Sequence, residues 1–283
     1  MKTNTLISLN KIAKVYRGQN VETYALKDIS LNINQGDYIC ISGPSGCGKS
    51  TLLSLLGLLD SPTAGDYFIK EVDTKTLDMD QQAELRNLHI GFIFQSFNLI
   101  DELSVFDNVA LPLTYREPAM SPSEIELAVK QALDEVEMGH RAQHKPNQLS
   151  GGQRQRVMIA IALACEPKIL IADEPTTALD ATVQNSILEL LKRLCKNYNM
   201  GMIFISHDLG VVKNVADEIM VMYRGEVMEY GNSAEVFKSP TNPYTKGLLA
   251  CRPTSETSFV RLPVVDDFMG GQRPKLKLRS EES

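Results

Sequence analysis

Residues 38–56 read YICISGPSGCGKSTLLSLL, an apolar run that leads through a glycine-rich loop into an apolar repeat at helical spacing. The run Tyr38–Ser42 predicts a buried strand, and Lys49–Leu59 predicts a helix. The loop between them fits the pattern GxxxxGK(S/T). In such a loop, glycines let consecutive backbone N–H groups turn toward one anion, and the helix N-terminus adds the positive end of its dipole. The segment therefore predicts a phosphate-binding strand–loop–helix unit.

This loop is the predicted binding site for the phosphates of ATP. Lys49 supplies a point charge for the β- and γ-phosphates, and the hydroxyl of Ser50 would ligate Mg²⁺. Because Cys47 lies inside the loop, we also expect alkylation of its thiol to inactivate the protein unless ATP is bound. The residues expected to contact the nucleotide are Gly43, Pro44, Ser45, Gly46, Cys47, Gly48, Lys49, Ser50 and Thr51.

Two adjacent acids follow the apolar run Ile169–Ala172, which has the composition of a buried strand. In parallel sheets, ligands bind at the carboxyl ends of the strands. Asp173 is placed to hold Mg²⁺ through its water shell. Glu174 is the candidate general base for an attacking water, a role typically worth about 10²–10⁴ in rate. Taken alone, two solvated acids in a turn would be the commoner explanation of this pair.

The rest of the sequence alternates predicted strands and helices. Residues Ile7–Val15 and Ile29–Ile33 alternate apolar and polar side chains, which predicts a small antiparallel β-layer. The pattern is helical from 104 to 137, again from 182 to 196, and Met202–Ile205 is a further apolar strand. These elements predict an α/β fold with a mostly parallel sheet that is covered on both faces.

A second glycine-rich element, LSGGQ at residues 149–153, precedes the predicted helix Arg154–Ala164 and forms a second anion-binding helix start. A single chain needs only one phosphate-binding element of this kind to bind one triphosphate. With this pentapeptide the sequence resembles the ABC ATPases, whose signature motif it is, over roughly residues 6–231. In that family two cassettes face head to tail. The resemblance implies that Ser150, Gly151, Gly152 and Gln153 of one copy close over ATP held by the other.

Other landmarks of the family occur in the order that the resemblance requires. Tyr16 matches the aromatic residue that stacks on adenine, although a tyrosine of the core is an alternative reading. Gln95 matches the glutamine that contacts Mg²⁺ and the attacking water. Asp180 matches the loop that crosses the dimer seam, and His207 matches the histidine that contacts the γ-phosphate.

The resemblance also implies a domain plan. It is a P-loop NTPase core of RecA-like type with an antiparallel β-subdomain and a helical subdomain at about residues 96–160. The ATPase domain is expected at residues 1–240. A short C-terminal extension of the oligopeptide-importer type is expected at 241–283 and to end in a disordered tail.

Composition limits where such a chain works and what it binds. A formal charge of −6 gives no general attraction to nucleic acid, so no nucleic-acid partner is expected. No apolar stretch reaches the roughly 18–20 residues of a membrane span, and the N-terminus lacks a secretory signal. Five cysteines without a CxxC pair indicate reduced thiols and no zinc site. Tails that resemble those of oligopeptide importers can carry clustered cysteines for an iron–sulfur cluster, but Cys251 stands alone, so no cluster is expected.

The expected function is that of the ATP-hydrolysing subunit of an ABC transporter, at the cytoplasmic face of the inner membrane. Its expected partners are separate transmembrane permease subunits, a second cassette that is identical or paralogous, and, for an importer, a solute-binding protein. Soluble ABC ATPases of DNA repair or translation are disfavoured. The first group interrupts the cassette with long coiled coils, and the second carries two cassettes in one chain.

Two halves of the sequence point to different kinds of transporter. Residues 57–65 and 90–116 look like lipoprotein-release and macrolide-efflux exporters. Residues 175–184, 206–212, 221–231 and especially 242–249 look like oligopeptide importers. Peptides and an amphiphilic export substrate therefore both stay open as cargo.

Overall fold

The computed structural model describes residues 5–18, 22–177 and 179–251. The described residues end at residue 251, so the tail that we expected to be disordered lies outside them. None of the described helices combines the length and the apolar character that a membrane span needs. Cys40, Cys47, Cys165 and Cys195 are buried thiols.

A six-stranded sheet forms the centre of the fold, in the order β10-β9-β3-β8-β7-β6. Every neighbouring pair is parallel except β10 and β9. Strands β3 and β8 are buried along their whole length, which explains why they are continuous apolar runs without alternation. The carboxyl ends of the parallel strands share one edge of the sheet. Its strands are β3 (Tyr38–Ser42), β6 (Ile90–Ile93), β7 (Ile169–Asp173), β8 (Gly201–Ile205), β9 (Glu218–Tyr223) and β10 (Glu226–Asn232).

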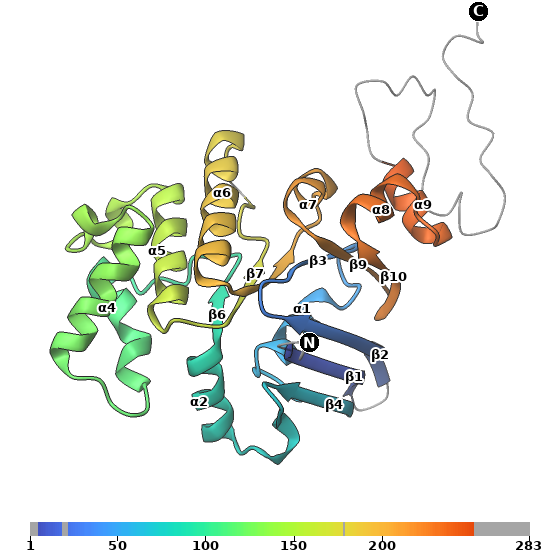
Figure 1. Cartoon of the computed structure of the whole chain (residues 1–283), viewed down its shortest axis with the longest axis horizontal. Helices are drawn as coiled ribbons and strands as arrows, with labels where there is room; N and C mark the ends of the chain where they lie inside the picture. Colours follow the sequence, from blue (N-terminus) through green and yellow to red (C-terminus); the bar gives the residue numbers. More distant parts are fainter. Residues whose placement is uncertain (1–4, 19–21, 178, 252–283) are drawn as a thin grey trace, which may run out of the picture.

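A four-stranded antiparallel sheet in the order β2-β1-β4-β5 lies on one side of the central sheet (Figure 1). Helix α1 (Lys49–Leu56) packs its leucines into a shared core with both sheets. This core fixes the start of α1, and with it the phosphate loop, against the central sheet. The outer strands are β1 (Thr5–Arg17), β2 (Glu22–Asn34), β4 (Ala64–Ile69) and β5 (Val72–Asp73).

Helices occupy the segment between β6 and β7 and lie at one end of the molecule (Figure 1). Its α-helices begin at capping serines: Ser104 caps α3, Ser121 caps α4 and Ser150 caps α5. Their apolar sides meet α6 in a second core. The elements are α3 (Val105–Ala110), η2 (Leu111–Tyr115), α4 (Pro122–Glu135), η3 (Gly139–Arg141), η4 (Pro146–Gln148) and α5 (Gly151–Ala164).

The remaining helices surround the central sheet. Figure 1 shows α6 and α7 on the side opposite the antiparallel sheet, and α8 and α9 at the end away from α4. Helix α2 begins after Asp78, whose side chain forms a capping box with Gln81. Their bounds are η1 (Thr74–Thr76), α2 (Met79–His89), α6 (Ala181–Tyr198), α7 (Leu209–Val215), α8 (Ser233–Lys238) and α9 (Pro243–Ala250).

The predicted α/β fold with its mostly parallel sheet is confirmed, and the differences are local. The helix predicted over Lys49–Leu59 ends at Leu56, where Gly57 follows. The helical stretch from 104 to 137 is split into α3, a 3-10 turn and α4. Pro112 lies near the start of that turn, and a proline inside a helix removes a backbone donor and clashes with the preceding turn.

Candidate nucleotide site

The phosphate loop curls around the ammonium group of Lys49. Lys49 Nζ donates to the carbonyl oxygens of Gly43 at 2.8 Å and Pro44 at 2.9 Å. Gly48 has a φ of 108°, and a Cβ there would lie 2.6 Å from the carbonyl oxygen of Ala25. Only glycine satisfies both conditions, so this position fixes how tightly the loop approaches β2.

The predicted chemical groups meet in one pocket of about 970 Å³ beside this loop. Gln95 reaches it from the end of β6, Asp173 and Glu174 from the end of β7, and His207 from the segment after β8. Parallel pairing of these strands places their carboxyl ends together. The residues that line this pocket are Thr23, Tyr24, Ala25, Lys27, Gly43, Pro44, Ser45, Gly46, Gly48, Lys49, Ser50, Thr51, Gln95, Asp173, Glu174, His207, Arg224 and Gly225.

Glu174 and His207 form a directed pair inside the pocket. His207 Nδ1 lies 2.9 Å from Glu174 Oε1, and the Thr177 hydroxyl donates to Oε2 at 3.1 Å. Glu174 has a left-handed φ of 45°, and its N–H donates to the carbonyl oxygen of Ile205 at 3.1 Å. The Glu174 side chain is 18% exposed while that of His207 is 66% exposed. A carboxylate oriented in this way can accept a proton from water in the pocket.

Asp173 is the last residue of β7 and directly precedes Glu174. Burial raises the pKa of its carboxyl group, the charge of Glu174 raises it further, and Lys49 opposes both effects. Asp173, Ser50 and Gln95 bring carboxylate, hydroxyl and amide oxygens to one pocket. Oxygen donors of this kind suit Mg²⁺, which is usually bound through one or two carboxylates together with phosphate oxygens.

The signature residues lie outside this pocket. Ser150 is exposed and caps α5, with Gln153 N donating to Ser150 Oγ at 3.3 Å. Asp180 caps α6 by accepting from Thr182 N and Val183 N. The two helix starts pack closely, because a Cβ on Gly152 would lie 2.7 Å from Val183 Cγ1. One chain thus presents a phosphate loop and a separate capped helix start.

The comparisons with known proteins agree with this geometry. The ABC transporter family matches residues 26–177, which is more than half of the chain. The chain belongs to the ABC transporter family. As a member, it is an ATP-binding cassette and an ATPase, with ATP as its nucleotide.

Two curated ABC relatives align over most of their lengths. An ABC transporter ATP-binding protein of Methanocaldococcus jannaschii, MJ0796, is 43% identical over 224 residues, covering 78% of this chain and 95% of its own. The methionine import ATP-binding protein MetN 2 of Bacillus anthracis is 38% identical over 288 residues, covering 98% of this chain and 80% of its own.

Solved ABC cassettes share the fold. A dimeric structure of MJ0796 in a post-hydrolysis state with ADP and Pi has a TM-score of 0.74 and 41% identity, covering 81% of this chain and 99% of that one. The structure of cbiO1 from Clostridium perfringens, part of an ABC transporter complex, has a TM-score of 0.75 and 30% identity, covering 83% and 92%.

Cys47 and Tyr16, which were both expected to contact the nucleotide, do not line the pocket. The Cys47 side chain is only 3% exposed, and burial raises the pKa of its thiol despite the nearby ammonium group of Lys49. Both features argue against a readily alkylated Cys47, since a buried thiol with a raised pKa is a poor nucleophile. Tyr16 is 45% exposed and does not line the pocket, and its hydroxyl donates to Asp60 at 3.1 Å.

Several residues that line the pocket belong to no motif that the sequence analysis used. Tyr24 lies on β2, opposite Val15 in the β1–β2 pairing, next to the pair of Tyr16 and Thr23. Arg224 and Gly225 come from the turn between β9 and β10. They reach the pocket because β9 pairs with β3 and because β2 bonds to the β9–β10 turn through Lys27 N and Gly225 O, segments that are far apart in the sequence. In the sequence, only the aromatic side chain of Tyr24 could have suggested a contact with a nucleotide base.

Proposed function

We propose that this ABC cassette binds ATP with Mg²⁺ in a site completed by a second copy of the chain. The observation that supports this most directly is the separation of the phosphate loop from the exposed start of α5. Both are anion-binding features, and a head-to-tail pair of chains would bring one onto the other. MJ0796, which covers 81% of this chain as a solved structure, has a dimeric form with ADP and Pi.

Each pocket residue takes one role in this proposal. The backbone N–H groups of residues 43–51 and the ammonium group of Lys49 hold the phosphates. Ser50, Gln95 and Asp173 would hold Mg²⁺, which supplies positive charge to the phosphate oxygens. Glu174 accepts a proton from the attacking water.

His207, with Nδ1 protonated, would hold the Glu174 carboxylate in place through their 2.9 Å contact and face the terminal phosphate. The adenine would lie on the side of Tyr16 and Tyr24. From the partner, Ser150, Gly151, Gly152 and Gln153 would contact the phosphates, with Asp180 at the seam.

Hydrolysis by the purified chain tests this function. The expected result is phosphate release that requires Mg²⁺ and stops when the metal is chelated with EDTA. Lys49→Ala should weaken nucleotide binding, because it removes the point charge in the loop. If Lys49→Ala bound and hydrolysed ATP like the wild type, the assignment of the loop would be wrong.

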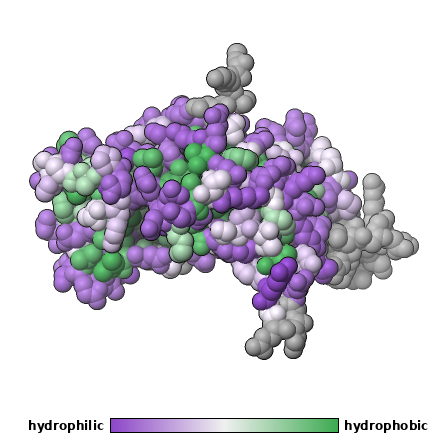
Figure 2. All heavy atoms as spheres, turned by 90° about the horizontal axis from the view of Figure 1, so that it is seen from below, coloured by the Kyte–Doolittle hydropathy of each residue, from purple (hydrophilic) through white to green (hydrophobic). Residues whose placement is uncertain are grey.

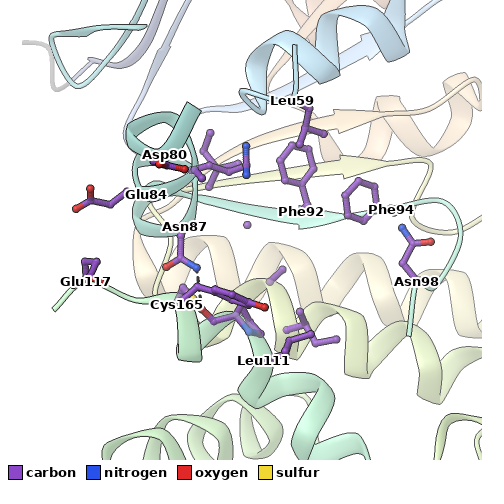
Figure 3. A pocket seen from close by; sticks show the side chains of 18 of the residues that line it. Leu59, Asp80, Glu84, Asn87, Phe92, Phe94, Asn98, Leu111, Glu117 and Cys165 are labelled. Carbon is purple, nitrogen blue, oxygen red and sulfur yellow. Dashed lines mark hydrogen bonds between the residues drawn. The ribbon is translucent and has the colours of Figure 1, made fainter. Parts of the chain in front are cut away.

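A second pocket, of about 800 Å³, offers a place for the transmembrane partner. Figure 3 shows Phe92 and Phe94 side by side in its lining, with Asp80, Glu84 and Asn87 on α2. The two phenylalanine rings are parallel to within 6°, with centroids 5.2 Å apart. Gln95 of the nucleotide pocket follows Phe94 directly in the chain, so an occupant of this groove would lie near the phosphate end of the site.

The lining of this groove predicts the chemistry of its occupant. Three of its lining residues are large and apolar yet exposed to solvent: Leu59 is 54%, Ile100 40% and Tyr115 72% exposed. Exposed apolar residues that gather in one groove mark a site for binding a partner. Figure 2 shows one face that is mostly hydrophilic, with hydrophobic residues gathered in patches. The groove also carries the carboxylates Asp78, Asp80, Glu84 and Glu117 against one guanidinium group, that of Arg86. We propose that a short permease helix with apolar residues and at least one Lys or Arg docks here.

Charge reversal in the groove tests this docking. Asp80→Lys with Glu84→Lys should reduce co-purification of the permease and leave ATP hydrolysis by the isolated chain unchanged. Glu126→Lys is the matched control, because Glu126 is exposed on α4 and does not line the groove. Equal recovery of the permease with the groove variant and the control would contradict the proposal.

We further propose that the transporter imports an amino acid or a peptide and that the cassette is held at the membrane by its permease. The relatives named for methionine import support import, because they align over 98% of this chain. The exporter-like residues 57–65 and 90–116 favour the alternative of an amphiphilic export substrate. Identifying the membrane polypeptide that co-purifies with the chain, and whether a solute-binding protein accompanies it, separates these two functions.

A further inference from the structure

The turn between β9 and β10 supports the phosphate loop from its outer side. Gly225 N donates to the carbonyl oxygen of Cys47 at 2.9 Å, and Lys27 N donates to the carbonyl oxygen of Gly225 at 2.8 Å. Gly225 has a φ of 81°, and a Cβ there would lie 2.7 Å from the carbonyl oxygen of Ala25. This turn is therefore held in one position relative to the loop.

Arg224 extends from this fixed turn into the lining of the nucleotide pocket. Its guanidinium carbon lies 5.0 Å from the centroid of the Tyr223 ring. No carboxylate in the described ranges forms an ion pair with it, whereas Lys27 in the same lining pairs with Glu226 at 2.8 Å. A guanidinium group is a good phosphate ligand, because its fork of N–H donors matches two oxygens at once.

Helix α9 of the C-terminal extension holds the ring beneath Arg224. Tyr244 of α9 is 2% exposed, and its ring stacks on that of Tyr223 with centroids 4.5 Å apart. Asn242 caps α9 by accepting from Tyr244 N at 2.8 Å, and its amide donates to the carbonyl oxygen of Met228 at 2.8 Å. Glu229 accepts from both the N–H and the hydroxyl of Thr241, at 2.6 and 2.8 Å. These contacts fix α9 on β10.

We propose that Arg224 is a second cationic ligand for the phosphates of the nucleotide, and that α9 positions it through the stacked rings of Tyr244 and Tyr223. The inference rests on the proposed ATP site and extends it. The C-terminal extension would then influence nucleotide affinity directly, through contacts that run from α9 to the pocket wall.

Equilibrium binding of ATP and of adenosine tests the ligand role of Arg224. Arg224→Gln should raise the Kd for ATP about tenfold or more, the loss expected for one charge-assisted contact. Adenosine affinity should not change, and Arg224→Lys should recover part of the ATP affinity. Lys246→Gln is the control, because this cation is exposed on α9 and does not line the pocket.

Truncation of the supporting ring tests the positioning role of α9. Tyr244→Ala should raise the Kd for ATP as Arg224→Gln does, and the double variant should add little, because both changes remove one contact. Tyr244→Phe should bind ATP like the wild type. Thermal unfolding checks that each variant is folded, and Tyr223→Leu, which removes the same stack from a partly exposed position, replaces Tyr244→Ala if that variant unfolds.

Two results would overturn this inference. Wild-type ATP affinity in Arg224→Gln would remove the ligand role, and additive losses in the double variant would remove the coupling to α9. Failure of the wild type itself to bind ATP would instead reject the proposed function of the site.

Discussion

At the scale of single residues, two acids of the pocket adopt states that are unfavourable for the folded chain. Glu174 has a left-handed backbone conformation, and Asp173 carries a carboxyl group whose pKa is raised by burial. Non-glycine residues seldom adopt such a conformation without a reason in the surrounding structure. Here the hydrogen bond from Glu174 N to Ile205 O ties it to the neighbouring strand.

Glu174→Gln should separate binding from hydrolysis. The amide keeps the shape of the side chain but cannot accept a proton from water, so the rate of ATP hydrolysis should fall about 10²–10⁴-fold. The Kd for ATP should stay close to that of the wild type. Single-turnover phosphate release with a parallel binding titration measures both quantities. A variant that hydrolyses ATP at the wild-type rate would exclude Glu174 as the base.

Asp173→Asn should stabilise the nucleotide-free protein at neutral pH. The pKa of Asp173 is raised in the folded state. At pH values above the pKa of the unfolded chain, ionisation of this carboxyl group therefore destabilises the folded protein. Asparagine removes that charge, and the midpoint of thermal unfolding should rise. The gain should shrink as the pH falls below about 4, where the aspartate is protonated in both states. A gain that is the same at pH 3 and pH 7 would show that charge is not the cause.

At the scale of elements, the starts of α5 and α6 act as one unit because Gly152 allows them to touch. Gly152→Val should destabilise the chain by about 1–3 kcal/mol, since the new side chain would overlap Val183. Adding Val183→Ala should recover part of the loss by making room. Urea unfolding of the two variants measures it. Equal stability of Gly152→Val and the wild type would show that the helices are not in close contact.

Some elements could be predicted from the sequence and others could not. The strand Tyr38–Ser42 has the predicted bounds, because four apolar residues and a serine run directly into a loop with glycines at fixed positions. Helix α7 and strand β9 were not predicted. Seven residues are too few to show a helical repeat, and the buried run of β9 has no alternation that distinguishes strand from helix.

The same reasoning separates the predicted pocket residues from the missed ones. Lys49, Asp173 and Glu174 carry chemistry at a fixed spacing from a strand end, so a local pattern locates them. Arg224 follows β9, which pairs with the distant strand β3, and Tyr24 lies on β2, where Lys27 N donates to the carbonyl oxygen of Gly225. No local pattern records such a pairing, and only the three-dimensional structure could reveal it.

At the scale of the whole molecule, one chain carries both parts of the proposed nucleotide site, and these parts do not meet within it. The phosphate loop and its acids line one pocket, and Ser150 marks an exposed helix start outside that pocket. Two chains in head-to-tail contact would form two complete sites. The permease groove beside Gln95 would then convey to the membrane whether the two chains are together or apart.

The molar mass of Glu174→Gln in solution, with and without Mg²⁺ and ATP, tests this account most directly. We expect one chain without nucleotide and two with it, measured by size-exclusion chromatography with light scattering. Adding Ser150→Arg should leave ATP bound but keep the protein monomeric, because the new side chain would block the partner's phosphate loop. A protein that stays monomeric with ATP bound, or a dimer that Ser150→Arg does not disturb, would contradict a site shared between two chains.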